Sequence, residues 1–151
     1  MKKSLRPLLF FGLFAVIIGG VVGYKMYNKP HQNIDETVPE FVFMANDLHE
    51  AFESYPENAA FYNGFVIQLK GAIDKIISPN DTNITLLLRV ANPMGNIKCA
   101  MDPAFKDRLT GYTTNDTIIL KGILTGSTKT EELGLEFLDV EVSRCVVVSQ
   151  F

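Results

Sequence analysis

The chain has 151 residues, of which 47% are hydrophobic and 21% charged, so disordered and low-complexity classes are excluded and one domain is expected. Its charge is uneven, because five of the fourteen Lys and Arg residues lie in the first 29 positions and no acidic residue precedes Asp35. The remainder carries 9 basic and 17 acidic residues. A basic end on an acidic body favours a membrane-facing N-terminus and disfavours a body that holds phosphate backbones.

An uncharged, largely apolar run extends from Pro7 to Tyr24, which is just long enough to cross a bilayer core. We predict an uncleaved single-pass anchor over residues 1–28 that contacts the lipid bilayer through residues 7–24. A cleaved signal peptide and a buried helix of a soluble domain are the alternatives. Signal cleavage is disfavoured because no Ala-x-Ala site follows the run. Three basic residues precede the run and two follow it, so we expect the inner membrane, with the body outside the cytoplasm.

Residues 29–44 are polar, contain two prolines and show no helical or strand period, so they are predicted to be a linker. A short amphipathic helix follows, for which Asn46 is the expected N-cap and Pro56 the end or a kink. Its apolar stripe is predicted to consist of Leu48, Ala51, Phe52 and Tyr55. The dipeptide Asn63-Gly64 then predicts a turn.

Five strands separated by turn residues are predicted after this turn. Together with the amphipathic helix they form the predicted domain, residues 45–151. Asp102 and Pro103 predict a short helix after the third strand, because they suit the N-cap and first helical positions. Five strands favour a small all-β barrel over a sandwich, which usually needs about seven. The predicted strands are 65–77, with a bulge or coil at Gly71, then 84–90, 97–101, 117–124 and 135–148, with bends at Gly122 and Gly126.

The order of these elements and several short motifs resemble the tRNA_anti-like family, from Tyr24 to Val148. These are small bacterial proteins with an N-terminal hydrophobic segment and one OB-fold domain. The resemblance implies an all-β fold with short helices, a five-stranded OB-fold barrel preceded by a transmembrane helix and the amphipathic helix. It implies no functional residue. Segment 127–134 departs from the pattern, being longer and more polar than expected for that hairpin. The matching motifs are Tyr27-Asn28-Lys29-Pro30-His31, Leu69-Lys70-Gly71, Ile97-Lys98-Cys99, Leu120-Lys121-Gly122-Ile123-Leu124-Thr125-Gly126 and Arg144-Cys145-Val146.

In the OB topology that the resemblance implies, the last strand closes against the third, so Cys99 and Cys145 lie on neighbouring strands. Both can point inward, and we predict a disulfide between them in an oxidising compartment. The alternative is that they are two ordinary small core residues.

Little in the sequence indicates catalysis. Of the two histidines, His31 lies in the linker and His49 on the predicted helix, where His49 and Glu53 together are too few for a zinc site. We interpret that helix face as exposed to solvent. No nucleophile–base pair, phosphate-binding loop or nucleophile elbow is present. We therefore predict no enzymatic activity, no metal and no cofactor.

The second and third strands form the usual binding face of OB-folds. They carry Arg89 and Lys98 as a weak candidate binding face and no aromatic residue on which bases could stack. The acidic residues of the last strand and its loop are predicted to be a solvated outer face, or else to meet a cationic partner. The leading hypothesis is a membrane-tethered, non-enzymatic binding or interaction module that faces the periplasm, with a protein or small ligand as its partner. The alternative is an OB-fold domain that binds single-stranded or tRNA-like nucleic acid.

Overall fold

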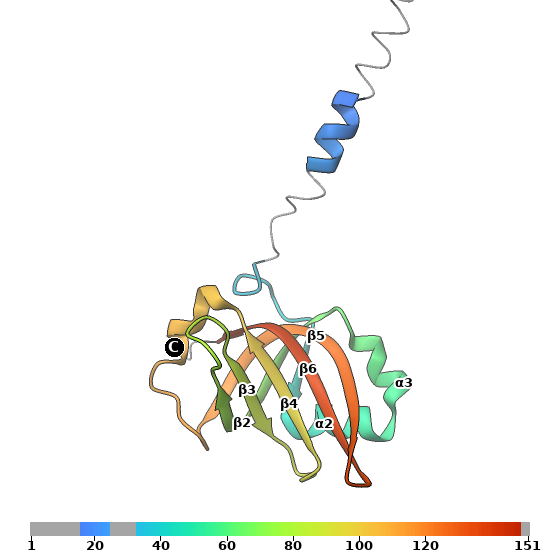
Figure 1. Cartoon of the computed structure of the whole chain (residues 1–151), viewed down its shortest axis with the longest axis vertical. Helices are drawn as coiled ribbons and strands as arrows, with labels where there is room; N and C mark the ends of the chain where they lie inside the picture. Colours follow the sequence, from blue (N-terminus) through green and yellow to red (C-terminus); the bar gives the residue numbers. More distant parts are fainter. Residues whose placement is uncertain (1–15, 25–32, 149–151) are drawn as a thin grey trace, which may run out of the picture. The chain divides into compact units, whose positions relative to one another are not determined.

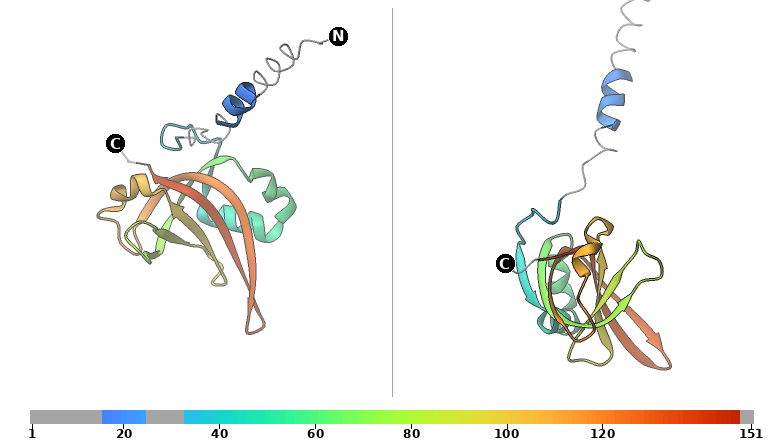
Figure 2. Two further views of the ribbon diagram at one scale, coloured as in Figure 1. Left: turned by 45° about the horizontal axis from the view of Figure 1, so that its top comes forward. Right: turned by 90° about the vertical axis from the view of Figure 1, so that its left-hand side faces the viewer.

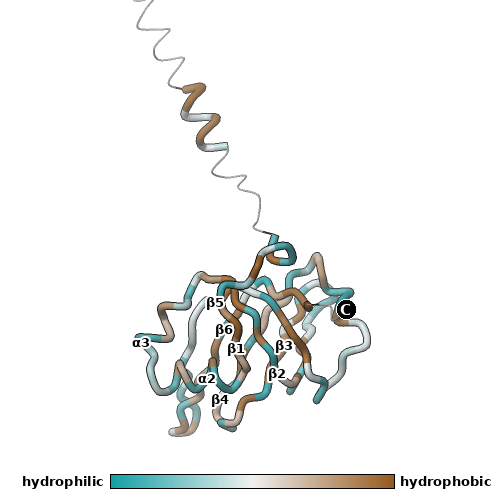
Figure 3. The backbone as a smooth tube through the Cα atoms, turned by 180° about the vertical axis from the view of Figure 1, so that it is seen from behind, coloured by the Kyte–Doolittle hydropathy of each residue, from teal (hydrophilic) through white to brown (hydrophobic). Residues whose placement is uncertain are grey.

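The computed structural model describes residues 16–24 and 33–148. The chain divides into two compact units, residues 1–32 and 33–151. In the first unit, residues 16–24 are helical and exposed, and Figure 3 colours them from hydrophobic to neutral. Within the described ranges, no helix combines the length and the apolar character needed to cross a membrane. Residues 1–15 and 25–28 of the predicted anchor lie outside those ranges.

The second unit is mostly β-sheet with short helices (Figure 1). Five strands form a closed ring, in which each strand pairs with the next and β2 also pairs with β5. In ring order the neighbours are β2, β3, β4, β6 and β5. β4 and β6 run parallel, and the other ring pairs are antiparallel. The strands are β2 (Val66–Ile77), β3 (Thr85–Arg89), β4 (Gly95–Met101), β5 (Thr117–Glu132) and β6 (Leu135–Val147).

All five predicted ring strands are therefore confirmed, with two local differences. The irregularity expected at Gly71 of β2 lies instead between Ile73 and Lys75, where the pairing with β3 shifts register. β5 does not stop at residue 124 but continues to Glu132, so segment 127–134 is mostly a hairpin rather than a loop. Both views in Figure 2 show this β5–β6 hairpin projecting beyond the other strands. The pairing of β5 with β6 shifts register between Lys121 and Ile123 and between Leu124 and Gly126, next to the two glycines at which bends are predicted.

A sixth strand, β1 (Phe41–Met44), was not predicted, because its range was assigned to the linker. It pairs in parallel with the first half of β2, from Phe41 opposite Ile67 to Met44 opposite Lys70. Four residues are too few to show a clear alternation of polar and apolar side chains, which is why the sequence pattern missed it. Residues 33–44 therefore pack with the ring rather than forming a free linker, and Ile34 is fully buried there.

Helix α2 (Ala45–Ser54) follows β1 directly and contacts β2, β3, β4 and β6. Its N-cap is Met44, not the predicted Asn46. Of the predicted apolar stripe, Leu48 and Phe52 are buried, but Tyr55 is largely exposed. The helix ends at Ser54, and Pro56 starts a new short helix, α3 (Pro56–Ala59), that leads into the 3-10 helix η1 (Ala60–Tyr62).

The predicted helix after β4 is present as the 3-10 helix η2 (Pro103–Leu109). The Asp102 side chain caps it by accepting a hydrogen bond of 3.0 Å from the backbone N–H of Ala104. The core inside the ring consists of inward-facing side chains that alternate with outward-facing ones along the strands, and in Figure 3 hydrophobic and hydrophilic colours are mixed along them. Fully buried examples are Ile67, Leu69, Ile73, Leu86, Leu88, Ile97, Ile118, Leu120 and Leu124.

Candidate functional site

The predicted binding face on β3 and β4 carries its two cations in ion pairs. Arg89 donates through Nε and Nη2 to one carboxylate oxygen of Asp74, at 3.1 Å each, and through Nη2 to the side-chain oxygen of Asn115 at 2.9 Å. The Lys98 ammonium lies 2.7 Å from a carboxylate oxygen of Asp139. Each positive charge is therefore balanced by a neighbouring carboxylate on an adjacent strand.

This face also lacks stacking platforms. Strands β3 and β4 are described in full and contain no aromatic residue. The aromatic side chains gather elsewhere, around β1 and the turn η1, with ring centroids 4.8 to 6.4 Å apart. The members of this cluster are Phe41, Phe43, Phe61, Tyr62 and Phe65. The predicted face is thus close to neutral and polar, not a basic aromatic groove.

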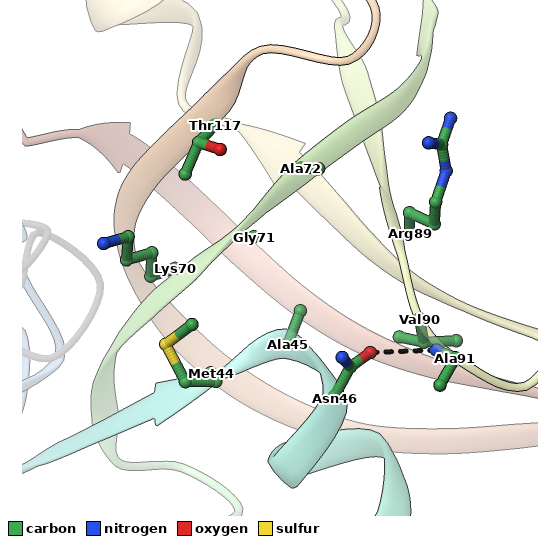
Figure 4. A pocket seen from close by; sticks show the side chains of 10 residues that line it. All are labelled: Met44, Ala45, Asn46, Lys70, Gly71, Ala72, Arg89, Val90, Ala91 and Thr117. Carbon is green, nitrogen blue, oxygen red and sulfur yellow. Dashed lines mark hydrogen bonds between the residues drawn. The ribbon is translucent and has the colours of Figure 1, made fainter.

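A cavity of about 380 Å³ lies beside this face, where two strands meet the same edge of β2 (Figure 4). The last β1 pairing with β2 is at Lys70, and the first β3 pairing is at Ile73. Gly71 and Ala72 therefore have neither strand as a neighbour on that edge. The cavity is lined by Met44, Ala45, Asn46, Lys70, Gly71, Ala72, Arg89, Val90, Ala91 and Thr117.

Small side chains make this cavity possible. A Cβ atom on Gly71 would lie 2.8 Å from the Cβ of Ala45 and 3.3 Å from a methyl carbon of Leu88, so only glycine lets the start of α2 approach β2 this closely. Asn46 closes the far side, because its side-chain oxygen accepts a hydrogen bond of 2.8 Å from the backbone N–H of Ala91. Asn46 thus ties α2 to the end of β3 instead of capping its own helix.

Sequence reasoning named only Arg89 among the functional groups of this cavity. Lys70, Asn46 and Thr117 come from three different elements, and they line one cavity because the pairing of β1 with β2 stops before the pairing of β3 begins. The sequence signal for this cavity was the pair of small residues Gly71 and Ala72. Because β1 was not predicted, Gly71 indicated only a bulge in the strand.

The predicted solvated helix face holds for Asp47, Glu50 and Glu53, which are exposed, but is wrong for His49. His49 is only 2% exposed, and its Nε2 donates a hydrogen bond of 2.9 Å to the backbone carbonyl of Leu138. Its Nδ1 lies 3.8 Å from a carboxylate oxygen of Glu53. The imidazole points inward because Gly95, opposite it on β4, leaves room for it. In the described part of the chain, no three His, Cys, Asp or Glu side chains group as metal ligands would. His31 lies outside the described residues.

Cys99 and Cys145 are both fully buried and are free thiols in the structure. The predicted adjacency of their strands is confirmed, because β4 pairs with β6 in the register that places Cys99 opposite Val142 and Met101 opposite Cys145. Burial raises the pKa of the Cys145 thiol well above its usual value, and a hydrogen bond with the Cys99 thiol raises it further. The strands of the two thiols are therefore neighbours, and the disulfide stays a prediction.

These features define an OB-fold-like domain extended at its N-terminus by a strand and a helix, with a near-neutral strand face and a cavity beside it. The sequence profile of the tRNA_anti-like family matches residues 1–133, and the chain belongs to that family. A comparison with curated proteins gives no match.

Solved structures with a similar arrangement are distant from this chain. An asparaginyl-tRNA synthetase of Entamoeba histolytica, in complex with asparaginyl-adenylate, is 18% identical over 59% of this chain and 22% of its own, with a TM-score of 0.39. An OBody, AM3L09, bound to hen egg-white lysozyme is 12% identical over 60% of this chain and 88% of its own, with a TM-score of 0.41. The matched part thus spans about a fifth of the synthetase.

Proposed function

We propose that the protein is a membrane-tethered, non-enzymatic OB-fold binding module that faces the periplasm and whose ligand is a small molecule or a protein, not nucleic acid. The observation that supports it best is the pairing of Arg89 with Asp74 and of Lys98 with Asp139 on the strand face that OB-folds use for binding. Non-specific nucleic-acid affinity comes from cations that replace counterions on phosphates. Cations already neutralised by carboxylates contribute little of it.

The tether and the compartment are supported by the sequence alone, through the uncharged run of residues 7–24 and the basic residues before it. Their test is protease added to spheroplasts that express the full chain. The body should be digested while a cytoplasmic marker stays intact. Full protection of the body under these conditions would reverse the orientation.

Family membership favours one other function, since the family is named for its likeness to a tRNA-binding domain. The two functions are separated by titrating a labelled single-stranded RNA with the full chain in nanodiscs of neutral lipid at physiological salt. We expect no binding tighter than about 10⁻⁴ M. Micromolar affinity that falls steeply with added salt would contradict the proposal and establish nucleic-acid binding.

A pair of variants tests whether the ion pairs on this face are the reason for the expected lack of RNA binding. In Asp74→Asn/Asp139→Asn, both cations of the face lose their carboxylate partners, so affinity for the RNA should rise at least about tenfold above the wild-type limit. The matched control, Asp81→Asn/Asp107→Asn, changes the net charge equally but leaves both ion pairs intact. An equal rise in both variants would show that net charge, not the pairing on this face, sets the affinity.

A further inference from the structure

The cavity at Gly71 has the size of a small-molecule site and an apolar floor. Its volume of about 380 Å³ lies within the roughly 300–1,000 Å³ that such sites occupy. The methyl groups of Ala45 and Ala72 and the side chain of Val90 form the floor, between β2 and the start of α2 (Figure 4). A short apolar group is the part of a ligand that suits such a surface.

The polar groups around this floor are hydrogen-bond donors. Because the oxygen of the Asn46 amide is already bonded to Ala91, the amide offers its NH₂ group. The Thr117 hydroxyl points toward Ala72 in Figure 4. Lys70 forms no hydrogen bond or ion pair with the described residues, so its ammonium and its three donors are available.

Negative charge is missing from the cavity lining. None of its ten lining residues is acidic, and the carboxylate of Asp74 is paired with Arg89. In Figure 4, Arg89 and Lys70 lie at opposite ends of the cavity with their charged groups directed away from each other. Arg89 is held in place by Asp74 and Asn115, whereas Lys70 has a flexible stem that can swing over the opening.

From this arrangement we infer that the cavity binds a small organic anion: a carboxylate held by Lys70 with help from Thr117, which lies opposite Ala72 on β5, attached to a short apolar body that lies on Ala45 and Ala72. The inference deepens the binding role proposed above and does not depend on the tether or the compartment. The site exists because of the N-terminal β1–α2 extension, since Met44, Ala45 and Asn46 form one wall. It is distinct from the β3–β4 strand face, with which it shares only Arg89.

Hexanoate is a suitable probe, because it joins a carboxylate to a short alkyl chain. The full chain in neutral-lipid nanodiscs is titrated with hexanoate while the methyl NMR signals of its alanines are followed. We expect saturable shifts in the millimolar range for Ala45, Ala72 and Ala91. Hexanol, which lacks the charge, and inorganic phosphate, which lacks the apolar body, should each bind at least about fivefold more weakly.

Three variants connect the binding to this cavity. Lys70→Gln removes the available cation and should lower the affinity for hexanoate about five- to tenfold. Ala72→Leu fills the cavity and should abolish the shifts of Ala45 and Ala91. The matched control, Ala100→Leu, adds the same bulk at an exposed alanine on β4 and should bind hexanoate as the wild type does.

Unchanged binding in Ala72→Leu, or the absence of saturable shifts in the wild type, would overturn the inference. Tighter binding of phosphate than of hexanoate would overturn it too, because it would assign the site to a phosphate group. None of these results contradicts the proposed module with a protein partner, which the RNA titration tests separately.

Discussion

Replacing Gly95 by Ala is the sharpest test of how α2 is held on the ring. An added Cβ atom at this position would lie 2.0 Å from Nε2 and 2.6 Å from Cε1 of His49, and 2.8 Å from the carbonyl oxygen of Leu138. All three distances are too short for non-bonded atoms, so the imidazole has to move. Moving the imidazole costs free energy, because it is buried and its Nε2 donates a hydrogen bond to the Leu138 carbonyl.

The expected cost has two parts. Overpacking of a well-packed interior costs about 1–3 kcal/mol. Loss of the bond from His49 to Leu138 leaves a buried polar group unsatisfied, at a further cost of about 1–3 kcal/mol. Gly95→Ala should therefore lower the free energy of unfolding by about 2–6 kcal/mol. That is a large share of the roughly 5–15 kcal/mol that stabilises a typical domain.

The assay is urea unfolding of the full chain in mild detergent, followed by far-UV circular dichroism, in a double-mutant cycle with His49→Ala. Removing the imidazole makes room for the new methyl group, so the double variant should lose at least about 1 kcal/mol less than the sum of the two single losses. The Leu138 carbonyl remains close to the added carbon, so rescue should be incomplete. A Gly95→Ala protein within about 0.5 kcal/mol of the wild type, or strictly additive losses, would refute this account of the contact.

Two further predictions concern the segment before β1 and the buried thiols. The bidentate bond from Arg108, with an Nη2–Oδ2 distance of 2.9 Å, is the main reason that the pKa of Asp35 is lowered. Stability from this pair should thus be present above the unfolded-state pKa of about 4 and be lost as pH falls through the lower folded-state pKa. In urea titrations, the wild type should have a free energy of unfolding at most about 1 kcal/mol above that of Asp35→Asn, because the pair is partly exposed. This difference should vanish in acid, and a difference that does not change with pH would contradict the prediction. For protein taken from an oxidising compartment, alkylation after denaturation without reduction should modify neither Cys99 nor Cys145, since their disulfide should add roughly 3–4 kcal/mol of stability; modification of both would exclude the bridge.

The ring strands were predictable because their side chains alternate with a period of two and because turn residues separate them. β3 is the clearest case, with Leu86 and Leu88 buried as the pattern indicates. β1 was not predictable, because its four residues gain their strand conformation from pairing with β2, which a local pattern does not record. The same holds for Asn46 and His49, whose partners Ala91 and Leu138 lie 45 and 89 positions away.

The candidate site was harder to predict for a related reason. Arg89 was recognised by its place on a predicted strand, but its neutralisation by Asp74 depends on the register between β2 and β3. The cavity depends on where β1 stops, because one more residue of pairing on β2 would cover Gly71.

The extension from β1 through η1 has three consequences for this OB-fold-like ring. It places α2 against β2, β3, β4 and β6, with His49 bonded to Leu138. It supplies the aromatic rings of Phe41, Phe43 and Tyr62, which pack against one another around β1, away from β3 and β4. It also leaves a two-residue gap in the pairing of β2, lined by donors and methyl groups. The same short segment thus covers one end of the ring with α2 and leaves Gly71 and Ala72 without a strand neighbour on one edge, which is where the ligand site proposed above would lie.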